Sequence, residues 1–146
     1  MFGDFEFTST DIKHYINRFR GHDFIWNKGK LYCFNGKYWK VDEDGLEMRK
    51  YIGEELYKTL REIYFECYFD YLSADKRKKI ETNLLKLKTL QFEKEIVEKT
   101  RENLTVEEDV FDNNPFLLGF NNLVYDPKLG QFRQYIRSDM LSHHRL

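Results

Sequence analysis

The chain has 146 residues, 41% of them hydrophobic and 17% aromatic, and a formal net charge of −1 at pH 7. This length predicts one domain, large enough to bury a core without disulfides or metals. The small net charge excludes strong attraction of the whole molecule to DNA or to an anionic membrane, so a polyanion contact needs a local patch. No apolar stretch approaches the roughly 20 residues of a bilayer span, which predicts no membrane partner.

The two cysteines lie in apolar segments and lack the spacing of a zinc site. We therefore expect Cys33 and Cys67 to be buried free thiols in a reducing compartment. The N-terminus carries acids where a signal peptide has a basic region. Together these features predict an intracellular protein.

The first predicted element is a short amphipathic helix. Thr8 to Asp11 offer capping side chains, and apolar residues then recur at helical spacing until Gly21 ends the run. The apolar residues of this helix are Ile12, Tyr15, Ile16 and Phe19.

Residues 23–41 change to strand composition, with Asn35-Gly36 between two aromatic-rich runs. This dipeptide favours a two-residue hairpin turn, because both central positions of a type I′ turn need positive φ. That turn would place Tyr32 opposite Trp39 and Cys33 opposite Tyr38. One face of the hairpin would then carry Tyr32, Phe34, Trp39 and Val41.

Two long helices follow. The first is expected from about Leu46 to Leu72, with Asp44 and Glu47 as a capping box. The second is expected from Ser73 to about Thr100, which makes an antiparallel helical hairpin. The predicted buried stripe of the first helix is Leu56, Leu60, Ile63, Tyr64, Cys67 and Tyr71, widened by Phe65, Tyr68 and Phe69.

Thr105 and Glu108 fit the cap of a further short helix, whereas Val106 to Phe111 fit an extended segment equally well. The stretch FNNLVYDPKLGQFR, residues 120–133, then predicts two short strands across a turn. The predicted fold class is α+β: mostly helical, a long helical hairpin with an N-terminal antiparallel β-hairpin or meander and a C-terminal β-hairpin. We expect one domain over residues 1–142, cut from a longer protein, and a tail over 143–146.

The sequence gives no catalytic, cofactor-binding or metal site. It contains neither GxxxxGK[ST] nor GxGxxG. Asp42-Glu43-Asp44 resembles a magnesium-binding acidic pair, but without a third carboxylate nearby we interpret it as a turn and helix cap. The histidine pairs His14 and His22, and His143 and His144, receive no ligand role.

Two features suggest nucleic-acid binding instead. A basic strip at a predicted helix start can lie along phosphates, and hairpin lysines among aromatics can combine phosphate contacts with base stacking. The alternatives are a solvated helix face and a lysine-protected sheet edge. The strip is Lys76, Arg77, Lys78 and Lys79, followed by Lys86 and Lys88; the hairpin residues are Lys28, Lys30, Lys37, Lys40 and Trp39.

The closing stretch NPFLLGFNNLVYDPKLGQFR resembles the closing motif of the poxvirus-type primase-helicase N-terminal-like domain. YCFNGKYWKVD is similar to an upstream element of the same family, and the resemblance covers about Asp23 to Ser142. Leu123 and Pro127 stand where the family usually has glycine and leucine. The matching residues are Trp39, Asp42, Asp112, Asn114, Pro115, Leu117, Leu118, Phe120, Asn122, Val124, Asp126, Gly130, Phe132 and Arg133.

The resemblance implies a domain between a primase and a superfamily 3 helicase, a hexameric ATP hydrolase, in viral DNA replication. It implies no cofactor in this chain, with ATP and Mg²⁺ held by the absent helicase domain. The implied partners are the primase and helicase domains of the same polypeptide, further copies in the hexamer, and possible DNA, at a viral replication site in the host cell. The alternative is a stand-alone protein-interaction or regulatory domain without a nucleic-acid role.

Overall fold

A computed structural model describes the backbone of residues 5–107, 111, 118–120, 123–126, 129–134 and 140, and side chains in 5–107, 111, 129–131 and 140. The chain divides into two compact units, Met1–Arg20 with Asp44–Asn103 and Gly21–Glu43 with Leu104–Leu146. Each unit is built from two separate stretches of sequence. The predicted single domain over 1–142 stays a prediction, and the tail 143–146 lies outside the described residues.

Helix α1 (Ser9–Phe19) of the first unit confirms the first predicted element. Thr8 is its N-cap, and Thr8 and Asp11 form a reciprocal capping box. Ile12 and Ile16 are fully buried, while Phe19 lies 44% exposed. The helix therefore presents a narrower apolar face than its spacing predicted.

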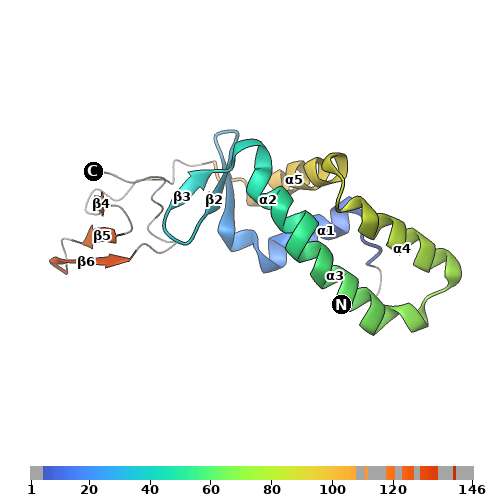
Figure 1. Ribbon diagram of the computed structural model, residues 1–146. Helices are drawn as coiled ribbons and strands as arrows, with labels where there is room; N and C mark the ends of the chain where they lie inside the picture. Colours follow the sequence, from blue (N-terminus) through green and yellow to red (C-terminus); the bar gives the residue numbers. More distant parts are fainter. Residues whose placement is uncertain are drawn as a thin grey trace. The chain divides into compact units, whose positions relative to one another are not determined.

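The predicted helix from 46 to 72 is one continuous helical run (Figure 1). It begins differently from the prediction, because the N-cap is Gly45, which makes no side-chain capping bond. Asp44 instead accepts a bond from the Arg49 side chain at 3.3 Å. The run consists of α2 (Leu46–Lys50), the π-helical η3 (Tyr51–Leu56), α3 (Tyr57–Ile63), the π-helical η4 (Tyr64–Tyr68) and the 3₁₀ turn η5 (Phe69–Tyr71).

The buried stripe of this run repeats at strict four-residue intervals. An α-helix has 3.6 residues per turn, so such a stripe would drift around it. The π-helical segments use i→i+5 bonds and hold more residues per turn, which keeps the stripe on one face. Three predicted buried positions of this run are wrong, since Cys67 is exposed, Phe65 is 44% exposed and Tyr71 is 88% exposed; of the two cysteines, Cys33 alone is buried as predicted. The stripe is Met48, Ile52, Leu56, Leu60 and Tyr64.

The second predicted helix is two helices, α4 (Ala74–Lys86) and α5 (Leu90–Leu104). Ser73 caps α4 as predicted. The break occurs because Leu87, Lys88 and Thr89 make i→i−3 backbone bonds, and the Thr89 hydroxyl accepts from the amide of Phe92. α3 and α4 lie side by side, which confirms the helical hairpin for this part (Figure 1).

The second unit contains an antiparallel sheet of β1 (Phe24–Asn27), β2 (Lys30–Phe34) and β3 (Trp39–Val41). The 3₁₀ turns η1 (Gly21–Asp23) and η2 (Glu43–Gly45) flank it in sequence. The two-residue turn with two positive φ values is Lys28-Gly29, at 53° and 78°, between β1 and β2.

The predicted turn at Asn35-Gly36 is therefore wrong. The Asn35 side chain accepts bonds from the amides of Lys37 and Tyr38, both at 2.9 Å, so β2 and β3 are joined by a four-residue loop. Tyr32 pairs with Val41, and Phe34 with Trp39. The register has moved by two residues, and an even slip keeps each side chain on its predicted face.

Thr105 bridges to Trp26 in β1, and the amide of Val106 donates to the Trp26 carbonyl at 2.8 Å, which agrees with the extended alternative at its start; residues 108–110 lie outside the described residues. A second antiparallel sheet contains β4 (Leu118–Phe120), β5 (Leu123–Asp126) and β6 (Gln131–Gln134). β5 and β6 are the predicted closing hairpin, and Gly130 in their turn has φ +65°. Leu123 lies in β5. The α+β fold class is confirmed, and no described helix meets the length and hydropathy of a membrane span.

Candidate functional site

A shallow groove runs between the α3–η4 stretch and α4 in the first unit. It has a volume of about 130 Å³. Tyr57, Arg61 and Phe65 follow the buried stripe by one residue, so the four-residue interval places all three along one wall. The other wall is formed by Glu81, Leu84 and Leu85.

Aromatic and cationic side chains are paired along this groove. The Arg77 guanidinium lies 4.0 Å from the centroid of the Phe69 ring, and its Nε donates to the Phe69 carbonyl at 2.8 Å. Two further pairs have cation-to-centroid distances of 4.9 Å and 4.3 Å. Such pairs are attractive because the ring face is electronegative. We define the aromatic–cation seam as Tyr57 with Lys88, Phe65 with Arg61, and Phe69 with Arg77.

The seam exposes part of its apolar surface. Phe65 is 44% exposed and Leu85 is 65% exposed, whereas Leu84 beside them is buried. Exposed apolar groups rimmed by charge are typical of contact sites. The seam therefore has the chemical character that is typical of contact surfaces.

One carboxylate, that of Glu81, lines the groove and accepts a hydrogen bond from a tyrosine. The Tyr64 hydroxyl donates to Glu81 Oε2 at 2.6 Å. Burial raises the pKa of Tyr64, and the bond to Glu81 raises it further, so the hydroxyl stays protonated. Among the cations of the seam, Arg61 lines the groove with this carboxylate, and Arg77 and Lys88 belong to the neighbouring ring–cation pairs.

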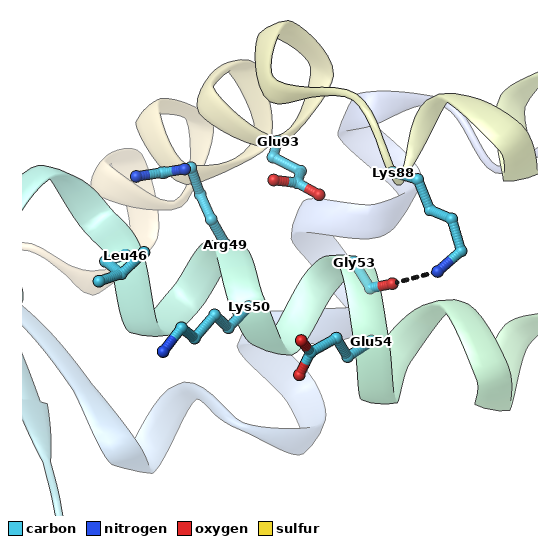
Figure 2. Close-up of a pocket in the computed structure, with 7 residues that line it drawn as sticks. All are labelled: Leu46, Arg49, Lys50, Gly53, Glu54, Lys88 and Glu93. Carbon is cyan, nitrogen blue, oxygen red and sulfur yellow. Dashed lines mark hydrogen bonds between the residues drawn. The ribbon is translucent and has the colours of Figure 1, made fainter.

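A larger cleft of about 370 Å³ lies at the α2–η3 end of the same helical run. Figure 2 shows Lys88 reaching across to Gly53, whose carbonyl accepts from Nζ at 3.0 Å. Lys88 thus belongs to both the cleft and the seam. The cleft is lined by Leu46, Arg49, Lys50, Gly53, Glu54, Lys88 and Glu93.

Gly53 allows the close approach of Glu93 in this cleft. A Cβ on residue 53 would lie 2.6 Å from Glu93 Oε2, and only a shift of that carboxylate would admit it. Burial raises the pKa of Glu93, while the positive charges of Arg49 and Lys88 oppose the rise. The cleft therefore combines cations with a partly desolvated carboxylate.

The predicted basic strip is distributed around α4. Arg77 belongs to the seam, and Lys79 forms an ion pair with Glu6 at 3.1 Å. Lys76 and Lys78 are exposed. Lys78 and Glu81 are three residues apart, so Lys78 lies on the groove side of α4.

The structure does not gather the predicted hairpin residues into one patch. Lys28 and Lys30 lie at one end of β2 and Lys37 at the other, roughly 14 Å away at strand spacing. Lys40 pairs with Cys33, on the opposite face from Lys30.

Trp39 is a sequence-based candidate for base stacking, with a core position as the alternative, and its side chain is only 2% exposed. Its ring packs against Phe34 and Phe111, at centroid distances of 5.5 Å and 5.8 Å. No ring face is left for a base, so we leave Trp39 out of the candidate site.

Sequence reasoning missed Arg61 and Phe65. Phe65 was placed in the buried stripe because the helix was read at 3.6 residues per turn. The signal was present in the strict four-residue repeat of apolar residues from Met48 to Tyr64. That interval indicates a widened helix and moves Phe65 to the surface.

The family-motif residues that the structure describes lie in the two sheets or directly next to their strands. Asp42 is buried, and its amide donates to the Leu31 carbonyl at 2.8 Å. The rest of the motif follows the second sheet, while Pro115 and Asn122 lie outside the described residues. Phe120 is in β4, Asp126 in β5, Gly130 in the turn, and Phe132 and Arg133 in β6.

Within the described part of the chain, no three or more His, Cys, Asp or Glu side chains are grouped to hold a metal ion. A search of curated proteins found no match to the chain. A comparison with protein families matched residues 12–145 to the family described as D5 N terminal like. The match covers nearly the whole chain, both sheets and the seam included, and agrees with the resemblance of the closing motif. The chain belongs to this D5 N-terminal-like family, the N-terminal-like domain of primase-helicases.

Proposed function

We propose that the chain is a non-catalytic accessory or collar module of a viral DNA primase-helicase. It aids assembly of the helicase ring, coupling of the primase to the helicase, or guidance of DNA. The observation that supports this proposal most is the family match over residues 12–145. ATP and Mg²⁺ are bound by the helicase domain of the parent protein, which also supplies the superfamily 3 hydrolase activity.

The surface chemistry agrees with action through binding. The aromatic–cation seam leaves apolar and cationic side chains exposed on the folded first unit. Its partners under this proposal are the primase and helicase domains of the same polypeptide, further copies in the hexamer, and DNA.

The direct test is deletion of this module from the parent protein. The parent with and without the module is compared for particle mass by light scattering, for DNA-stimulated ATP hydrolysis and for unwinding of forked DNA. We expect unwinding to be lost, together with ring assembly or with the dependence of ATP hydrolysis on DNA. If all three properties survive the deletion, an accessory role is excluded.

The isolated chain gives a second test. Purified 146-residue protein should neither hydrolyse ATP nor synthesise primers, and either activity would contradict the proposal. The coding sequence also separates a module from a stand-alone interaction domain. A GxxxxGK[ST] motif within about 150 residues after Leu146, about one domain length, supports the module. A stop codon directly after Leu146 supports the stand-alone domain.

A further inference from the structure

We infer that the aromatic–cation seam binds single-stranded nucleic acid, with bases stacked on Phe65 and Arg61 and phosphates held by Arg77, Lys78 and Lys88. The inference deepens the proposed function, and rests on it for the relevance of a nucleic-acid partner. It differs from the sequence-based prediction because the stacking residues come from α3 and η4 and none come from the β-sheet.

The seam presents its groups in the order that a strand needs. Rings and cations are paired at Phe69, Phe65 and Tyr57, at helix positions separated by eight residues or fewer. A nucleic-acid strand also carries one π face and one negative charge at each regular step. An acidic peptide needs cations but no ring beside each of them, so the pairing of ring with cation favours nucleic acid.

The length of the seam fits a short site. From Tyr57 to Phe69 the helical rise gives about 18 Å, and stacked nucleotides advance by about 3.4 Å per strand. This is room for about five nucleotides, near the smallest single-stranded sites of about 4.

A single strand is favoured as the ligand because the stacking surface is a partly exposed ring with a guanidinium beside it. Phe65 is 44% exposed, and Arg61 lies over the same ring at 4.9 Å. An unpaired base can lie against this ring and guanidinium, whereas bases inside a duplex present only their edges in the grooves. The Glu81 carboxylate keeps its negative charge while Tyr64 donates to it, so phosphate binding depends on the cations around it.

The chain offers a matched control pair for this site. Phe19 is also 44% exposed on a helix, and Arg18 lies over its ring at 5.6 Å. Arg18 and Phe19 thus have the same residue types and ring exposure as Arg61 and Phe65, but lie on α1, outside the groove lining.

The test is fluorescence anisotropy of the 146-residue protein with a labelled oligothymidylate of about 12 nucleotides. Phe65→Leu and Arg61→Gln should each weaken binding about tenfold, since stacking is worth ~1–3 kcal/mol per base. Phe19→Leu and Arg18→Gln should change the Kd by less than about twofold. Binding should also weaken between about 50 and 200 mM salt, as phosphate contacts require. Leucine keeps apolar packing, and the urea midpoint of each variant verifies folding.

Three results would overturn the inference: no binding to the single strand at about 50 mM salt, equal affinity for a duplex of the same length, or equal losses in the test and control variants. If an acidic peptide also displaced the labelled strand, the inference would still be overturned by any of these three results. A chain that fails to bind DNA but still assembles with the parent helicase leaves the proposed function standing. The two proposals therefore fail separately.

Discussion

The β1–β3 sheet and the aromatic–cation seam carry similar residue types and use them in opposite ways. In the sheet, Trp39 is buried and the lysines are divided between two ends and two faces. In the seam, rings remain partly exposed and cations lie on their faces. The strand repeat of two separates neighbouring residues, whereas a widened helix turn gathers every fourth one. Local composition alone therefore does not identify a binding surface.

The largest expected effect contrasts Trp39 with Phe65. Trp39→Ala should lower the free energy of unfolding by about 3–5 kcal/mol, because a fully buried ring leaves a cavity. Phe65→Ala should cost about 1 kcal/mol or less, because the ring is already partly exposed. Urea unfolding of both variants measures the two costs. Similar costs at the two positions would break the comparison.

The second prediction compares two cations of the seam with two lysines of the β1–β3 sheet. Arg77→Gln with Lys88→Gln should weaken single-strand binding about tenfold and reduce the salt slope by about 1.4, at ~0.7 per phosphate contact. Lys30→Gln with Lys40→Gln should leave the Kd within about twofold, because these lysines lie on opposite faces of the sheet. Anisotropy titrations at several salt concentrations decide between them. A larger loss for the sheet pair would move the binding site to the sheet.

The third prediction concerns the Tyr64–Glu81 bond. Tyr64→Phe should lower stability by about 1–2 kcal/mol, as for a hydrogen bond to a charged group. The pKa of Tyr64 is raised in the folded chain. Its contribution is therefore present below the unfolded pKa of about 10 and lost as pH rises above it.

Unfolding measured from pH 8 to 11 should accordingly show a smaller alkaline loss in Tyr64→Phe than in the parent chain. The matched control is Tyr71→Phe, because Tyr71 is 88% exposed. If the control and the test variant keep the same alkaline loss, the buried hydroxyl is not its source.

The smallest expected effect is at the cleft. The pKa of Glu93 is raised in the folded chain, so its charged form is disfavoured there, and stability from its protonated form is lost as pH rises. Glu93→Gln should therefore raise the urea midpoint slightly at pH 7 and leave it unchanged near pH 4. Glu95→Gln, at an exposed position on α5, should change neither value. A lower midpoint for Glu93→Gln at pH 7 would mean that Arg49 and Lys88 outweigh burial.

Elements with local signals could be predicted from the sequence. The Thr8 and Ser73 caps were found because a hydroxyl before a helix bonds the free amides of its first turn. The 46–72 helix and the closing hairpin of β5 and β6 followed from apolar periodicity and turn residues. The family motif could be recognised because it is a dense run of residues in one stretch.

Where two interactions of similar strength compete, the sequence did not show which of the two local structures forms. Asn35 favours a type I′ turn, but its side chain accepts two backbone amides and closes a longer loop instead. Leu87 to Thr89 fit a helix by composition, yet Leu87 is fully buried and Lys88 bonds Gly53 across the cleft. The candidate site was missed because it depends on where the π-helical segments fall along one helix.

The division of each unit between two stretches of sequence has a practical consequence. The chain passes from one unit to the other at residues 20/21, 43/44 and 103/104. A break at 43/44 divides both units, whereas removal of residues 1–20 or of residues 104–146 leaves one unit incomplete. Deletion mapping would then report that every fragment is required, even for a property that belongs to one unit. Point substitutions, rather than shortened versions, are the suitable tool for assigning roles within this family member.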